Sequence, residues 1–180
     1  MYRGITVAIG VVLCAVLFIS MISALPIGFA ADSEQEQTTS SLTVATVVDI
    51  TLSNVPIAWG TLSPNTENNL ANAGNPATVT VESTTNVNVD IYVKGTDWSD
   101  GSHTITVDKC HYDNDNVAGG ANWTALTTSY ATGPNQGFFE GVSPGTAKNT
   151  YWFIDIPAGQ WAGSYSNTIY FKAVKDGTTP

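Results

Sequence analysis

Residues 42–52 read Leu-Thr-Val-Ala-Thr-Val-Val-Asp-Ile-Thr-Leu, with an apolar or β-branched side chain at every second position. Side chains of a β-strand point alternately to its two faces, so this period of two predicts one long strand with a buried face. A polar leader at residues 32–41, Asp-Ser-Glu-Gln-Glu-Gln-Thr-Thr-Ser-Ser, precedes the strand. The pattern therefore marks the start of a β domain.

The chain beyond this strand repeats short alternating segments that are separated by turn residues. Gly, Pro, Asn and Asp bound the segments, as in Gly74-Asn75-Pro76, and these residues favour turns rather than strands. No segment shows a helical period. We expect an all-β fold, a single antiparallel β-sandwich of jelly-roll or immunoglobulin-like type over residues 42–176. The further strands are expected at residues 56–62, 77–82, 87–94, 103–110, 123–130, 137–142, 151–156 and 165–174.

The first 31 residues have the three parts of a secretory signal peptide. Arg3 lies near the start, an uncharged run extends from Gly4 to Ala31, and small residues precede Asp32. We expect residues 1–31 to be cleaved, which places the mature protein outside the cell or at its surface. Two alternatives remain open: an uncleaved membrane anchor, and an archaeal prepilin signal that is cut after Arg3-Gly4.

Charge excludes some partners. The chain has 6 basic and 15 acidic residues, a net charge of −9. Arg3 is the only charged residue before Asp32, so residues 32–180 have 5 basic and 15 acidic residues, a net charge of −10. Such a domain has no basic face for nucleic acid, and once the signal is removed we expect no membrane binding.

The sequence offers no recognisable catalytic centre. The metalloprotease HExxH, phosphate-binding P-loop, GxGxxG and CxxC patterns are absent, and His103 and His111 are the only histidines. We predict that the protein is not an enzyme. Cys14 lies in the signal segment, so Cys110 is alone in the mature chain and is expected as a half-buried strand residue without an intramolecular disulfide; pairing between two chains is the alternative.

We expect no cofactor, with calcium at two oxygen-rich turns as the alternative. The candidate ligands are Asp97 and Asp100 in one turn, and Asp113 and Asp115 in the other. Carboxylate and amide oxygens are the hard ligands that calcium prefers. Neither turn completes an EF-hand, and the same residues are common in surface turns that bind nothing.

Tryptophans near turns suggest carbohydrate as a further partner. Trp98, Trp123 and Trp161 flank expected loops, where an indole face stacks on a sugar or else seals the end of a sandwich. Trp152 lies in an apolar run and is expected in the core. Asn122 begins the only Asn-x-Ser/Thr sequon, Asn-Trp-Thr, and is a candidate glycosylation site.

The whole architecture resembles two groups of exported fibre proteins. The similarity rests on the strand at residues 42–52, the turn Trp59-Gly60-Thr61-Leu62-Ser63-Pro64 and the hairpin Ala162-Gly163-Ser164-Tyr165. In these points the chain resembles archaeal bundling pilins and the bacterial biofilm-matrix fibre proteins of the TasA type. The resemblance implies a homopolymer in which subunits donate strands to one another, without catalysis.

Two hypotheses for function follow. In the first, the protein is a secreted subunit of a pilus or biofilm fibre, and its N-terminal strand completes the sheet of a neighbour. The donor-strand candidates are Leu42, Val44, Thr46, Val48 and Ile50. In the second, it is a monomeric secreted β-sandwich that binds glycans or a surface protein through its loops.

Overall fold

The computed structural model describes residues 38–120, 123–132 and 137–180. The chain divides into two units between Leu42 and Thr43, and the second unit is Thr43–Pro180. The expected signal peptide and most of the polar leader lie outside the described residues. Within the described residues, no helix has the length and apolar character needed to cross a membrane.

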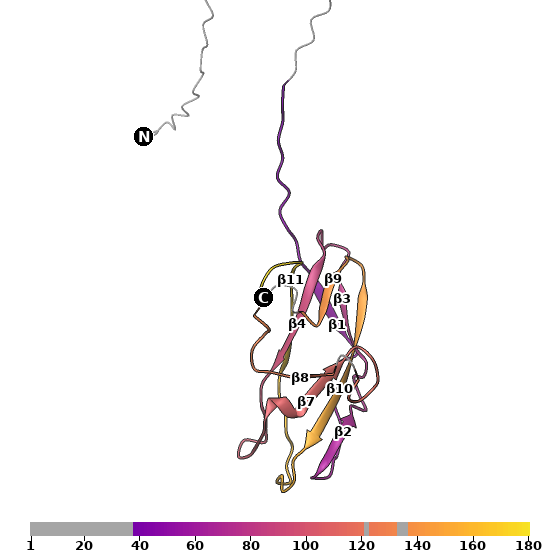
Figure 1. Cartoon of the computed structure of the whole chain (residues 1–180), viewed down its shortest axis with the longest axis vertical. Helices are drawn as coiled ribbons and strands as arrows, with labels where there is room; N and C mark the ends of the chain where they lie inside the picture. The colour runs from indigo at the N-terminus through magenta and orange to yellow at the C-terminus, as the bar shows by residue number, and fades with distance from the viewer. Residues whose placement is uncertain (1–37, 121–122, 133–136) are drawn as a thin grey trace, which may run out of the picture. The chain divides into compact units, whose positions relative to one another are not determined.

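The second unit is an all-β fold of antiparallel sheets that pack against each other, as the sequence predicts (Figure 1). The larger described sheet has the order β1-β3-β10-β7-β8, and β2 also pairs with β10. Its strands are β1 (Ile50–Ser53), β2 (Thr66–Leu70), β3 (Ala77–Val81), β7 (Cys110–Asp113), β8 (Thr124–Ala125) and β10 (Ala147–Ile156).

The second described sheet has the order β11-β4-β9. It consists of β4 (Val89–Gly95), β9 (Phe139–Val142) and β11 (Ile169–Lys175). A small hairpin, β5 (Trp98–Ser99) and β6 (Thr104–Ile105), continues from β4, and a 3₁₀ helix, η1 (Val107–Lys109), leads into β7. Ser99 also forms a bridge with Ser166, so the pairing of β4 with β11 is extended toward the hairpin.

The core lies between the two sheets in two clusters. One cluster combines Trp152 and Ile154 of β10 with Val93 of β4, and the ring of Phe171 on β11 packs against Trp152 at 6.0 Å. The other combines residues of β3, β4 and β9: Val79, Val81, Val89, Ile91, Phe139 and Val142. β3 alternates between buried and half-buried side chains, as its Ala-Thr-Val-Thr-Val sequence predicts.

The structure corrects the expected strand boundaries at the start of the domain. β1 begins at Ile50, so the strand expected over residues 42–52 is wrong for its first eight residues. Residues 56–62 contain only an isolated bridge from Ala58 to Ala73 rather than a strand. β2 was not expected, because Thr-Glu-Asn-Asn-Leu has no apolar alternation; it forms by pairing with β10.

Candidate functional site

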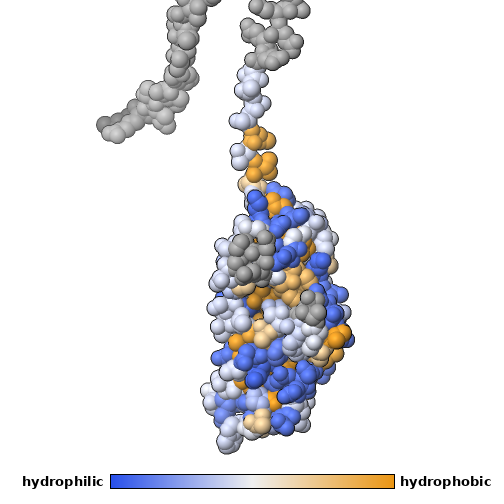
Figure 2. All heavy atoms as spheres, in the orientation of Figure 1, coloured by the Kyte–Doolittle hydropathy of each residue, from blue (hydrophilic) through white to orange (hydrophobic). Residues whose placement is uncertain are grey.

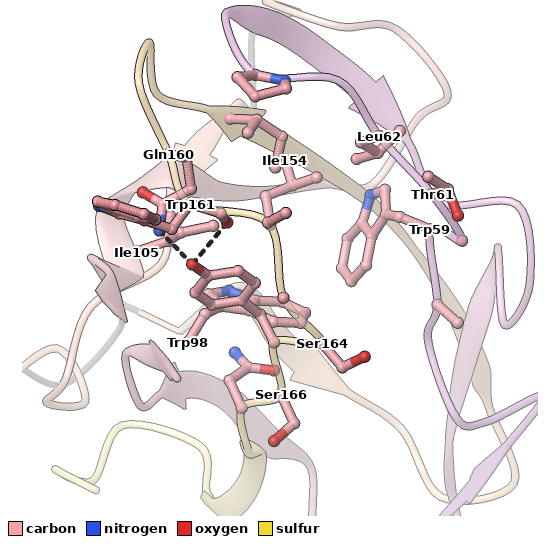
Figure 3. Close-up of a pocket in the computed structure, with 18 of the residues that line it drawn as sticks. Trp59, Thr61, Leu62, Trp98, Ile105, Ile154, Gln160, Trp161, Ser164 and Ser166 are labelled. Carbon is pink, nitrogen blue, oxygen red and sulfur yellow. Dashed lines mark hydrogen bonds between the residues drawn. The ribbon is translucent and has the colours of Figure 1, made fainter. Parts of the chain in front are cut away.

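An open, mainly apolar pocket of about 760 Å³ lies at the end of the domain that carries β5 and β6. Figure 3 shows Trp59, Thr61 and Leu62 on one chain segment and Trp161, Ser164 and Ser166 on another. We call this pocket the acceptor groove. Its apolar lining consists of Pro56, Ile57, Ala58, Trp59, Leu62, Pro64, Trp98, Ile105, Ile154, Ile156, Trp161 and Ala162.

The floor of the groove is formed by packed aromatic side chains. Trp59 and Trp98 meet edge to face, with ring centroids 5.2 Å apart. Trp59 donates its indole N–H to the carbonyl of Asn69 at 2.8 Å. The indole N–H of Trp98 is buried and has no hydrogen-bond partner among the described residues.

A short hydrogen-bond network fixes the wall at residues 160–165 (Figure 3). Gln160 donates from Nε2 to the hydroxyl of Tyr165 at 2.7 Å, and that hydroxyl donates to the carbonyl of Trp161 at 2.9 Å. These bonds hold the segment that connects β10 to β11. The hairpin expected around Ala162-Gly163-Ser164-Tyr165 is wrong, because β10 and β11 belong to different sheets. The segment instead forms one side of the groove.

The wall continues into an unpaired sheet edge. In the described chain β11 hydrogen-bonds to β4 alone, so its opposite edge has no partner strand. Ser164, Ser166 and Asn167, which precede β11, line the groove. A sheet edge beside an apolar groove is the geometry in which an added strand forms main-chain hydrogen bonds and buries alternate side chains.

The described residues before β1 expose apolar side chains. The exposed fraction is 89% for Leu42, 73% for Val44 and 45% for Val47. Figure 2 shows hydrophobic side chains exposed on the described segment that leads into the domain. Exposed Leu and Val two residues apart share one face of an extended chain.

From Ala45 onward the chain is hydrogen-bonded to its own domain, at Asn86. Asn86 donates from Nδ2 to the carbonyl of Ala45 at 2.8 Å, and its Oδ1 accepts the N–H of Val47 at 2.9 Å. Val48 and Ile50 pack partly buried against the second core cluster. Of the donor-strand candidates, Thr46, Val48 and Ile50 therefore lie on chain that is fixed within its own domain. Leu42 and Val44 lie before that anchored stretch.

The three tryptophans proposed for sugar binding do not form one platform. Trp98 is buried in the groove floor, and Trp161 is 69% exposed and stacks on His103 with ring centroids 5.2 Å apart. Trp123 stacks instead on His111, at 4.7 Å, and is not among the groove residues. Trp152 is fully buried, as expected. Asn122 lies outside the described residues.

The carboxylates of Asp97 and Asp100 are engaged within their own loop. Asp97 accepts the N–H of Val107 at 2.8 Å. Asp100 accepts the N–H groups of His103 and Ser102, and these bonds lower the pKa of Asp100 to about 2. The ring of His103 also lies 3.1 Å from Asp100. Both carboxylates therefore stabilise the local loop structure by accepting backbone N–H groups.

Asp113 is the last residue of β7 and is fully buried, and Asp115 lies in the loop that follows. Among the described residues, no group of three or more His, Cys, Asp or Glu side chains is arranged to hold a metal ion. The four aspartates expected as calcium ligands thus do not form a single centre. Cys110, expected to be half-buried, is fully buried at the start of β7, and burial raises its pKa.

Gly141-Val142-Ser143-Pro144-Gly145 matches the Gly-x-Ser-x-Gly pattern of serine hydrolases, which sequence reasoning had missed. The structure places Ser143 in the turn between β9 and β10. A nucleophile elbow requires a strand, a sharp turn and a following helix. Because a strand follows here, the match does not create a nucleophile.

No protein-family model, curated protein or solved structure matches this chain. The features of the structure that bear on function are the acceptor groove and the exposed apolar segment before β1.

Proposed function

We propose that the protein is a secreted structural subunit of an extracellular filament. In this proposal, the segment that ends at Val44 of one copy enters the acceptor groove of the next copy. The observation that carries the proposal is the presence, in one chain, of an exposed apolar segment and an apolar groove beside an unpaired sheet edge.

The side chains of the segment suit the groove. Leu42 and Val44 lie on one face of an extended chain, and the groove floor offers Trp59, Trp98 and Ile154 as apolar contacts. Burial of both side chains is worth about 1.5–3 kcal/mol for each. The donor's backbone would pair with the edge of β11 that lies opposite β4, beyond Ser166, whose own N–H and carbonyl are bonded to Ser99.

The proposed contact is directional. One copy contributes its N-terminal segment and the next contributes its groove, so the two surfaces differ. Such heterologous contacts do not close on themselves unless the rotation forms a ring, and they otherwise propagate into a filament. The proposal agrees with the resemblance to pilins and biofilm fibres, in which catalysis has no part.

Disulfide trapping tests the contact. Residues 32–180 contain the whole of Thr43–Pro180, with both core clusters. In this chain the double variant Val44→Cys with Ser166→Cys should form a ladder of cross-linked oligomers under oxidation. Native Cys110 is fully buried and does not compete. Filaments should be visible by negative-stain electron microscopy.

The matched control is Val44→Cys with Ser129→Cys. Ser129 is exposed but does not line the groove. Oxidation of this double variant should therefore give disulfide-linked dimers and no ladder of higher oligomers. Deletion of residues 32–44 should leave a folded monomer. Equal ladders from both pairs, or filaments from the deletion variant, would contradict donation by this segment.

Trp161 favours a second candidate function, binding of a glycan by a monomer. Its indole is 69% exposed at the groove and is held by stacking on His103. If the protein stays monomeric and is retained on a glycan array, Trp161→Ala should abolish that retention. The glycan function would then replace the filament function.

A further inference from the structure

Asp113 has a buried carboxylate oxygen without a partner. The residue is 0% exposed. Its Oδ1 accepts the backbone N–H groups of Asn114 at 2.6 Å and Asp115 at 3.3 Å. Its Oδ2 has no hydrogen-bond partner among the described residues. Buried polar oxygens are nearly always satisfied, so this one calls for a ligand.

Two more oxygens converge on the same point as Asp113 Oδ2. A Cβ atom placed on Gly120 would lie 3.0 Å from Asp113 Oδ2, 3.0 Å from the carbonyl oxygen of Val117 and 3.2 Å from Asp115 Oδ1. The three oxygens therefore lie close to one point beside Gly120, where Asp115 Oδ1 also accepts the N–H of Val117 at 3.1 Å and the Val117 carbonyl accepts the N–H of Gly120 at 3.0 Å. The space exists because residue 120 has no side chain.

The charge of this space is not balanced by the protein. The described ion pairs join His103 to Asp100 and His111 to Asp155. Neither Asp113 nor Asp115 pairs with a basic side chain in that part of the chain. Two carboxylates that face one space repel each other unless a cation lies between them.

We propose that Asp113, Asp115 and the Val117 carbonyl bind one calcium ion. Calcium accepts six to eight oxygen ligands in flexible geometry, at about 2.3–2.6 Å. Here two carboxylates and one carbonyl supply the protein ligands, and water supplies the rest, since residues 114–119 are exposed. Magnesium requires a stricter octahedral arrangement and dehydrates reluctantly, so the site favours calcium.

This site is separate from the acceptor groove. None of its residues lines that groove, and it does not depend on filament formation. With few protein ligands, the site should resemble the weak calcium sites of extracellular modules, with a Kd of about 10⁻⁴–10⁻³ M.

Calorimetric titration of residues 32–180 with calcium chloride tests the proposal. The wild-type chain should bind one calcium ion, and the same titration with magnesium chloride should give at least about tenfold weaker binding. Asp115→Asn, which changes an exposed residue, should weaken calcium binding by about tenfold or more. Asp113→Asn should do the same if it folds.

Gly120→Ala provides an uncharged probe. The backbone at Gly120 does not have a positive φ, so the added methyl group is constrained chiefly by the three oxygens. It should weaken calcium binding while circular dichroism shows an unchanged fold. Glu67→Gln is the control for Asp115→Asn. It also removes one negative charge, but at an exposed position on β2, and it should bind calcium as the wild type does.

Two results would overturn the proposal. The first is no saturable binding of calcium up to about 10 mM, well above the expected Kd. The second is unchanged affinity in both Asp115→Asn and Gly120→Ala, which would place any bound calcium elsewhere.

Discussion

The buried carboxylate of Asp90 accepts a hydrogen bond from the backbone N–H of Gly177 at 3.0 Å. Its other oxygen accepts the N–H of Gly141 at 2.9 Å. Asp90 is 0% exposed and lies on β4, the central strand of its sheet. One side chain thus connects β4 to the bend in β9 and to the turn after β11.

Replacement of Asp90 should destabilise the domain strongly. Asp90→Ala leaves two backbone N–H groups without their acceptors, and hydrogen bonds to a charged group contribute about 1.5–3 kcal/mol each. We expect the free energy of unfolding in urea to fall by about 3 kcal/mol or more. Asp90→Asn keeps one acceptor oxygen, so its free energy of unfolding should lie between those of wild type and Asp90→Ala. Equal stability of all three proteins would contradict this role.

Gly74 should be irreplaceable where it packs against Pro56, a residue that lines the acceptor groove. Its φ is +64°, and a Cβ there would lie 2.3 Å from the carbonyl oxygen of Pro56. Gly159 has a similar φ of +76° but open space around it. Gly159→Ala should therefore lower the free energy of unfolding only because alanine disfavours the left-handed backbone conformation, by about 1–2 kcal/mol. Gly74→Ala should lower the free energy of unfolding by clearly more, because the backbone at Pro56 must also move. Equal losses in the two variants would show that the close approach is relieved without strain.

The fold class was predictable because alternation of buried and exposed side chains is a local property. β3 shows it clearly, with every second residue buried. The same alternation made the prediction wrong at Leu42 and Val44. The sequence there has the pattern of a strand, but the described structure has no strand pairing before Ile50. Alternation indicates which residues would share a face, but not whether a partner strand is present.

The candidate sites were less predictable, since they depend on contacts between distant residues. β2 is polar and exists because β10 lies beside it. Sequence could not tell that Trp98 is buried whereas Trp161 is exposed, since both flank turns. It did identify Asp113 and Asp115 as oxygen ligands. The unpartnered oxygen and the space beside Gly120 are visible only in three dimensions.

Cys110 should be unreactive in the folded protein. It is 0% exposed, and burial, with a smaller effect of the Asp155 charge, raises the pKa of its thiol. The thiolate is the reactive form, so both access and ionisation are suppressed. A thiol reagent such as DTNB should label residues 32–180 only after urea unfolds them. Rapid labelling of the native protein, or disulfide-linked dimers of the wild-type chain, would contradict this burial.

His111 should make stability depend on pH. Its side chain is 15% exposed and stacks on Trp123, and Nδ1 lies 3.9 Å from Asp155. Burial lowers its pKa from the ordinary 6.5, and the charges of Asp155 and Asp108 oppose this only in part.

The folded state therefore favours neutral His111, whereas the unfolded chain takes up a proton near pH 6.5. Above that pH the residue contributes no pH dependence. As pH falls below it, the unfolded state binds more protons than the folded state, and stability falls until the folded pKa is passed. Urea unfolding at about pH 7.5 and about pH 5.5, on either side of the ordinary histidine pKa, measures the difference. His111→Gln should show a smaller loss of stability over this interval than wild type does, and His103→Gln should retain the loss due to His111. An identical pH dependence in His111→Gln and wild type would show that burial does not disfavour the protonated ring.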